Sequence, residues 1–178
     1  MSKLFENIKI GNLELKNRIV MPPMGTHFAN ADGTVSPRQI EYYARRAAGG
    51  AGMVEVEFSA IDPVQIAAST QVRISDDHFI PGLTALATAI KKNGARAAIQ
   101  IHHPGRQTSI RTTGVQPVAP SALAGPSPEM PRELTVTEIL ELEERFARAA
   151  LRAKQAGFDA VDIHGAHGYL LCQFLSPF

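Results

Sequence analysis

The sequence lacks the features that mark secreted and membrane proteins. It contains a single cysteine, Cys172, so no disulfide can form within the chain. No basic start followed by an apolar run and a cleavage site opens the sequence, and no apolar stretch approaches the roughly 18 residues that a membrane-spanning helix requires. These absences predict a cytoplasmic protein without a membrane partner.

The sequence also lacks a marked excess of positive or negative charge. The chain carries 18 Lys and Arg against 17 Asp and Glu, which gives a formal net charge of +1 with neutral histidines. Because the two signs are mixed, no long run of like charge is available to neutralise nucleic-acid phosphates, and we expect no such partner. With 178 residues and 44% hydrophobic content the chain can bury one sizeable core, which predicts one domain over residues 1–178.

Short apolar runs and helical patterns alternate along the chain. Runs typical of buried strands occupy 18–21, 53–57, 97–101 and 160–163, and helical patterns occupy 37–46, 81–93 and 136–155. Ser36 is the expected N-cap of the first helix, with Pro37 at its first position. Thr135 or Thr137 is the expected cap of the last helix. The stretch 105–131 is rich in Pro, Gly, Ser and Thr without a period, which predicts a long functional loop.

The alternation of strand and helix predicts parallel strands joined by right-handed crossovers. An open doubly wound sheet and part of a barrel both satisfy this pattern. Polar residues cluster where the strands end, at 23–27, 58–59, 100–106 and 164–169. Since the active sites of TIM barrels lie at the carboxyl ends of the strands, this clustering favours an α/β fold consisting of strands 1–4, the N-terminal half, of a (β/α)8 TIM barrel.

Three polar aromatic residues follow the last strand. His164, His167 and Tyr169 lie within six residues, so a sharp turn brings two imidazoles and a phenol into one pocket. This combination suits the binding of a planar anionic ring and the donation of a proton near neutral pH. Two alternatives stay open: ordinary polar groups of a loop, or a metal site of four imidazoles completed by His102 and His103.

Gln100 is the last polar residue inside an otherwise apolar strand. Its amide offers both a donor and an acceptor, which suits the edge of a pyrimidine ring. The alternative is a structural hydrogen bond to a neighbouring strand.

Several motifs in these segments resemble the Old Yellow Enzyme superfamily. They are LKNRIVMPPM at 15–24, YYARRA at 42–47, IQIHHPGR at 99–106, VAPS at 118–121, and AGFDAVDIHGAHGYLL at 156–171 with QFLSP at 173–177. Their order along the chain is that of the family, so chance similarity is far less plausible than for one short motif. The resemblance is strongest to the branch of 2,4-dienoyl-CoA reductase, 2-enoate reductase and related NADH:flavin oxidoreductases.

The resemblance implies an FMN-dependent ene-reductase that takes electrons from NADH or NADPH. The substrate would be a small unsaturated carbonyl compound: an enone, an enoate or an enoyl thioester. His164 and His167 would bind its carbonyl oxygen and stabilise the charge that develops there, and Tyr169 would donate the proton. The flavin would contact Pro22, Pro23, Met24, Gly25, Phe58 and Gln100.

Three positions depart from the family pattern. Gly25 stands where some members have a cysteine that tunes the flavin. His27 occupies a position often held by a tyrosine that contacts the substrate, so it is assigned here to substrate binding. Phe58 is bulkier than the small residues expected at its position, which implies a reshaped pocket beside the flavin.

The family also implies four further strands, which would carry the flavin-phosphate site and, in larger members, the cysteines of a 4Fe-4S cluster. A half-barrel has open sheet edges, so either a missing C-terminal half or a homo-oligomer is expected to cover them. The alternative function is a non-catalytic half-barrel scaffold that needs a partner chain.

Overall fold

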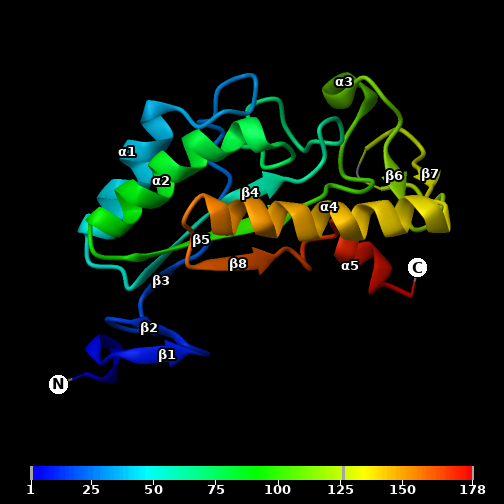
Figure 1. Cartoon of the computed structure of the whole chain (residues 1–178). Helices are drawn as coiled ribbons and strands as arrows, with labels where there is room; N and C mark the ends of the chain where they lie inside the picture. The colour runs from blue at the N-terminus through cyan, green and yellow to red at the C-terminus, as the bar shows by residue number, and fades with distance from the viewer. Residues whose placement is uncertain (1, 126, 178) are drawn as a thin grey trace.

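Four parallel strands form the central sheet of the computed structural model, which describes residues 2–125 and 127–177. The strands are β3 (Val20–Met21), β4 (Met53–Ala60), β5 (Arg96–His102) and β8 (Ala160–Ile163), and their spatial order is the order of the chain. Figure 1 shows them side by side in the middle of the molecule. The four predicted strands and their parallel pairing are confirmed. Consecutive parallel strands need crossover connections, and the helical patterns between the strands had indicated them.

Each crossover contains one long helix: α1 (Pro37–Ala48), α2 (Ile80–Lys92) and α4 (Val136–Gln155). The Ser36 hydroxyl caps α1 by accepting from the Gln39 amide at 3.1 Å. Thr135, not Thr137, caps α4, because its hydroxyl and the Glu138 side chain satisfy each other's backbone amides in a capping box. A short 3-10 helix, η2 (Asp77–Phe79), precedes α2.

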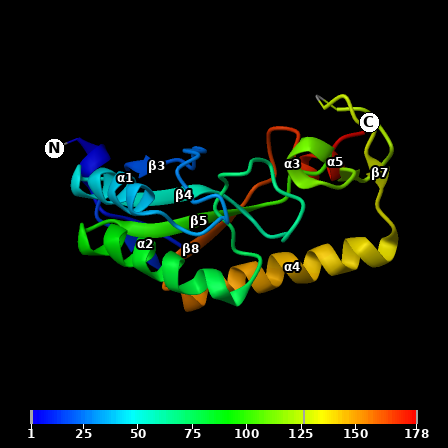
Figure 2. The same ribbon diagram turned by 90° about the horizontal axis from the view of Figure 1, so that it is seen from above.

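The three long helices cover one face of the sheet, as Figures 1 and 2 show from two directions. The largest core lies between the helices and this face. Its members include Tyr43, Val54, Val56, Leu83, Leu86, Ile90, Ile99, Ile101, Ala149 and Ala153. Burial of this much apolar surface is the main stabilising contribution to the fold, and it leaves the opposite face of the sheet free for polar side chains.

Strand β4 is longer than the sequence indicated, and its middle is irregular. The pairing register with β5 shifts between Val56 and Ser59. Around this irregularity Glu57 reaches toward helix α1, where it accepts a hydrogen bond from the Gln39 side chain. Phe58 lies on the opposite side and lines a cavity. The irregularity changes which face of the sheet each residue points to, because Val56 and Glu57 both face the helices and Phe58 faces the cavity.

A hairpin precedes the sheet. Helix η1 (Lys3–Phe5) leads into β1 (Ile8–Ile10) and β2 (Leu13–Leu15), which pair antiparallel around Gly11. Gly11 has a φ of 58°, a conformation that glycine adopts without strain. Leu15 packs against Met53 and Ala98, so the hairpin covers the amino end of the sheet.

The stretch 105–131, predicted as a long functional loop, contains short elements among its described residues. It contains α3 (Ile110–Thr113) and β6 (Val118–Ala119), and β6 pairs in parallel with β7 (Arg132–Glu133). Elements of two to four residues are too short to show a hydrophobic period, so the sequence analysis missed them. Helix α5 (Leu170–Phe174) ends the described chain, and among the described residues no helix is long and apolar enough to cross a membrane.

Candidate active site

The carboxyl ends of the four strands surround a cavity of about 540 Å³. Its lining consists of Pro22, Pro23, Met24, Gly25, Phe58, Gln100, Asp162, Ile163, His164, Gly165, Ala166, His167 and Tyr169. All the site residues expected from the sequence are in this lining except His27. The side chain of His27 is exposed, and its backbone adopts a left-handed conformation with a φ of 56°.

A tight turn after β8 aims His164, His167 and Tyr169 into the cavity. The His164 amide donates to the Ile101 carbonyl at 3.1 Å, and the Tyr169 amide donates to the Ala166 carbonyl at 3.2 Å. His167 sits within this turn at a φ of 58°, which is uncommon for a residue with a side chain. Backbone strain of this kind persists only where the surroundings impose it, and it often marks a functional site.

Two glutamines hold the turn in place, and neither was identified from the sequence. Gln107 donates from its side chain to the His167 carbonyl. Gln173, on α5, donates to the Gly168 carbonyl at 2.6 Å. Since both are separate from the turn, one in a loop and one in a helix, no local sequence signal linked them to it.

The polar rings contact one another closely. The ring centroid of His164 lies 5.2 Å from that of His167 and 5.0 Å from that of Tyr169. Burial lowers the pKa of His164, and the nearby His167 lowers it further. Burial also raises the pKa of Tyr169. At neutral pH the site therefore presents a neutral imidazole as a donor or acceptor and a protonated phenol as an acid.

His102 packs against the rings of His164 and Tyr169. Its ring is fully buried and stands perpendicular to the ring of Tyr169, with 4.3 Å between centroids. Burial holds the pKa of His102 well below its usual value, so the ring is neutral. Oε1 of Gln71 accepts from the Ala67 amide, and its NH2 group donates to the Phe58 carbonyl. The second N–H of this group points to Nδ1 of His102, at 3.2 Å. The hydrogen-bond network thus assigns the proton of His102 to Nε2.

Gln100 and Asp162 face each other across β5 and β8. Nε2 of Gln100 donates to Oδ2 of Asp162 at 2.6 Å, which is the structural hydrogen bond that the sequence analysis left open. The amide oxygen of Gln100 has no hydrogen-bond partner among the described residues, so it remains free to accept a donor from a ligand in the cavity. Asp162 was missed as a lining residue; its signal was a carboxylate inside an apolar run, in register with Gln100.

His103 has a different environment from His102, which removes the four-imidazole metal site. His103 is fully buried, accepts from the Gly105 amide at its Nδ1, and places Nε2 3.9 Å from Oδ2 of Asp62. Burial lowers its pKa to about 4, although Asp62 opposes this shift. Among the described residues no three His, Cys, Asp or Glu side chains gather in a way that could hold a metal ion.

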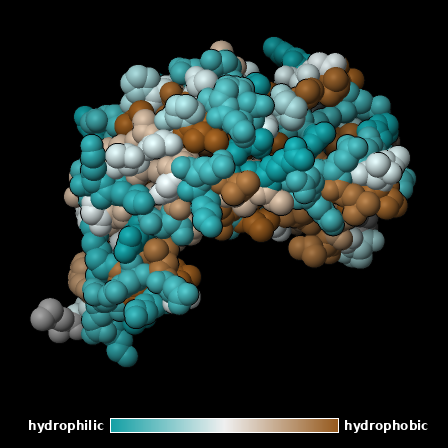
Figure 3. Space-filling view, viewed as in Figure 1, coloured by the Kyte–Doolittle hydropathy of each residue, from teal (hydrophilic) through white to brown (hydrophobic). Residues whose placement is uncertain are grey.

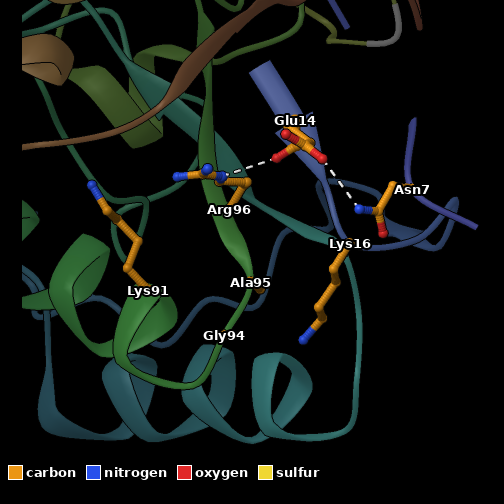
Figure 4. Close-up of a pocket in the computed structure, with 8 residues that line it drawn as sticks. Asn7, Glu14, Lys16, Lys91, Gly94, Ala95 and Arg96 are labelled. Atoms are coloured by element: carbon orange, nitrogen blue, oxygen red, sulfur yellow. Dashed lines mark hydrogen bonds between the residues drawn. The ribbon is translucent and has the colours of Figure 1, made fainter. Parts of the chain in front are cut away.

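A second cavity, of about 430 Å³, lies at the opposite, amino end of the sheet. Figure 4 shows Arg96 of β5 beside Glu14 of the hairpin, whose carbonyl oxygen accepts from Nε of Arg96 at 3.1 Å. Arg96 and Lys91 also lie 3.7 and 3.6 Å from Oδ1 of Asp159. Arg96 and Lys91 are therefore paired with groups of the chain itself, and we assign this end of the sheet a structural role. The polar side chains of the predicted site lie at the carboxyl end.

The cavity at the carboxyl end fits a flavin ring by the chemistry of its lining. Pro22, Pro23 and Phe58 offer apolar surface to the faces of a flat ring, and the amide of Gln100 offers polar atoms to its pyrimidine edge. Few ligands other than a planar, partly polar heterocycle combine these two needs.

Comparison with known proteins agrees with the fold. The profile of the NADH:flavin oxidoreductase / NADH oxidase family matches residues 3–178, so the chain belongs to this family of enzymes. Members of the family bind FMN and use NAD(P)H. A curated relative, the NADH oxidase of Thermoanaerobacter brockii, is 49% identical over 181 residues, which is 98% of this chain and 27% of that protein.

Two solved structures show the same arrangement of elements. A complex of 2-naphthoyl-CoA reductase with 2-naphthoyl-CoA matches with a TM-score of 0.94 and 32% identity, covering 98% of this chain and 29% of that one. The Old Yellow Enzyme homologue of Zymomonas mobilis matches with a TM-score of 0.89 and 33% identity, covering 95% and 50%. The chain therefore spans between about a quarter and a half of these proteins, and its four strand–helix units form part of a TIM barrel, as predicted.

Proposed function

We propose that the protein containing this chain is an NAD(P)H-dependent FMN oxidoreductase that reduces the activated C=C bond of an enone, an enoate or an enoyl thioester. One observation carries the proposal: His164, His167 and Tyr169 converge on a cavity whose other wall is apolar and ends in the amide of Gln100. A flavin stacked on that wall and a carbonyl substrate under the imidazoles would fill the two halves of the cavity.

His164 and His167 bind the substrate in this proposal. Nδ1 of His167 and Nε2 of His164 lie 3.5 Å apart, so N–H groups from both rings can reach one carbonyl oxygen. Donors fixed before the reaction stabilise the negative charge that develops on this oxygen without reorganising. Polarisation of the carbonyl makes the β-carbon electrophilic.

Tyr169 supplies the proton to the α-carbon. Its phenol is protonated at neutral pH, since the ordinary pKa of tyrosine lies well above neutrality and burial raises it further, and the ring lies between His102 and His164. The Tyr169 ring lies 5.0 Å from the His164 ring between centroids, so its hydroxyl can protonate the carbon next to a carbonyl bound by the imidazoles. His27 is proposed to contact only the part of a substrate that extends beyond the lining residues.

Pro22, Pro23, Met24, Gly25, Phe58 and Gln100 would hold the FMN ring. When bound, FMN supplies the hydride, which it obtains from NADH or NADPH. The loop of residues 22–25 is held to strand β4, since the hydroxyl of the next residue, Thr26, donates to the Glu57 carboxylate at 2.7 Å. A 4Fe-4S cluster needs four thiolates, so with only Cys172 in this sequence any cluster would be bound outside residues 1–178.

Further barrel units or a second copy of the chain are proposed to cover the free edge of β8. Figure 3 shows apolar side chains at the lower right, where α5 lies in Figure 1. Ile163 is 58% exposed and Leu175 is 79% exposed, and both line an apolar cavity of about 410 Å³ with Phe146 and Phe174. Apolar surface of this kind beside an unpaired strand edge is typical of an incomplete barrel.

The test is the intact mass of the purified natural protein together with its visible spectrum and its oxidation of NADH or NADPH with 2-cyclohexenone as acceptor. We expect a mass above 19.2 kDa, flavin absorption, and bleaching by the nicotinamide that the enone reverses. A colourless oligomer of 19.2 kDa subunits would contradict the proposal and favour the scaffold instead.

A further inference from the structure

We infer that Gly25 and Phe58 form a steric pair in which the Phe58 ring occupies the room of a side chain at position 25 and restricts the substituent that a substrate carries beside Tyr169. The second half of this inference rests on the proposed function. Both residues line the cavity, Gly25 after β3 and Phe58 in β4.

A side chain at position 25 would require the Phe58 ring to move. A Cβ atom built on Gly25 would lie 2.6 Å from Cε1 and 3.0 Å from Cζ of Phe58. Gly25 does not have a positive φ, so its backbone conformation does not require glycine. The reason for glycine here is therefore the phenylalanine that faces it.

The backbone of Phe58 is fixed, so the ring can yield only by rotating. Its carbonyl accepts from the Gln71 side chain at 3.0 Å, and Val56 and Ser59 on either side of it pair with β5. The ring lies 5.0 Å from the ring of His102 and 6.1 Å from the ring of Tyr169, measured between centroids. A side chain at position 25 would push the ring toward the cavity or toward these two aromatic residues.

The position of the ring predicts a preference among substrates. Tyr169 is proposed to protonate the α-carbon, so a substituent on that carbon lies near the Tyr169 hydroxyl and shares the space that Phe58 borders. We expect small or absent α-substituents in good substrates. Removing the Phe58 ring should admit larger ones, as enlarging an apolar pocket does.

A thermal double-mutant cycle tests the steric pair without relying on activity. The variants Gly25→Ala, Phe58→Ala and their combination are made in the full-length FMN-loaded protein, with Gly165→Ala as the control. A Cβ on Gly165 would have no heavy atom within 4 Å, and this glycine also lacks a positive φ. We expect Gly25→Ala to lower the melting temperature by about 2–4 °C in the wild type and to leave it unchanged in the Phe58→Ala background. Equal losses in both backgrounds would overturn the pair.

Substrate selectivity tests the second half of the inference. The ratio of kcat/KM for 2-ethyl-2-cyclohexenone over 2-cyclohexenone should rise about 10-fold in Phe58→Ala. Phe58→Leu, which keeps an apolar side chain, replaces this variant if the alanine protein does not fold. An unchanged ratio would overturn the selectivity role. If the wild type and the variants reduce neither enone, the proposed function and the selectivity role fail together, while the thermal cycle still decides the steric pair.

Discussion

His102 and His103 are neighbours in the chain and both are fully buried, yet they belong to different regions of the molecule. His102 joins His164, His167 and Tyr169 in what we term the cavity-side cluster. His103 lies on the other side of the chain, next to Asp62 and Arg145, which we term the helix-side cluster because Arg145 extends from α4. Successive side chains of a strand point to opposite faces, and this alternation separates the two imidazoles.

Both clusters line a cavity and contain a buried histidine, but among the described residues only the helix-side cluster contains an ion pair. In the cavity-side cluster, burial lowers the pKa of His102 and of His164. The helix-side cluster satisfies a buried carboxylate from within, since Asp62 accepts from two backbone amides at 2.8 Å and pairs with Arg145. This difference supports the proposed catalytic role of the cavity-side cluster, and we propose a structural role for the helix-side cluster.

The comparison is tested most severely by Tyr169→Phe. Loss of the proton donor should slow reduction of the enone by about 10²–10⁴-fold, while reduction of the flavin by the nicotinamide keeps its rate. Stopped-flow measurement of the two half-reactions checks this. Equal slowing of both half-reactions would remove Tyr169 from the role of proton donor.

Replacing the imidazoles should affect binding more than the proton transfer. We expect His164→Ala and His167→Ala each to weaken binding of p-hydroxybenzaldehyde, as its phenolate, by about 10–100-fold, because a hydrogen bond to a charged ligand is lost. A spectroscopic titration of the oxidised enzyme measures the Kd. His78→Ala is the matched control, because His78 is exposed and its ring pairs with Asp76 and Phe79, outside the cavity lining. An unchanged affinity in both site variants would show that these imidazoles do not bind the ligand.

The helix-side cluster should respond in stability and not in kinetics. Asp62→Asn keeps an oxygen for the backbone amides but removes the ion pair with Arg145, and we expect the free energy of unfolding to fall by about 2 kcal/mol. Glu144→Gln is the control, since its pair with Arg148 is exposed and should contribute less than about 0.5 kcal/mol. Urea unfolding measures both variants. A change in kcat/KM for Asp62→Asn without a loss of stability would contradict the structural role.

The smallest effect is a pH dependence of stability from His103. Its folded-state pKa, lowered by burial to about 4, lies below the value near 6.5 in the unfolded chain. Below pH 6.5 the unfolded state therefore takes up a proton that the folded state does not, and stability falls as the pH falls toward about 4. Between pH 7 and about pH 5.5, wild type should lose about 1 kcal/mol more than His103→Asn in urea unfolding. An identical pH profile in the two proteins would show that His103 does not contribute this dependence.

The sequence predicted the fold better than it predicted the individual contacts. Strand runs, helix caps and polar residues after the strands are local signals, so all four strands, three helices and the main lining residues were found before the structure. The contacts of Gln107, Gln173, Asp162 and His102 were missed because they join residues that are separated along the chain. The short elements within 105–131 were missed because they have no period.

By itself the sequence determined the four strands of the central sheet and the three long helices, the end of the sheet at which polar residues gather, and the family to which the chain belongs, because periodicity, capping and motif order are properties of neighbouring residues. Only the tertiary structure decided that His102 and His103 serve different clusters, that Gln100 binds Asp162, and that Phe58 fills the space of Gly25. These outcomes depend on strand register, on the irregularity in β4 and on close packing between distant segments, which no local pattern encodes.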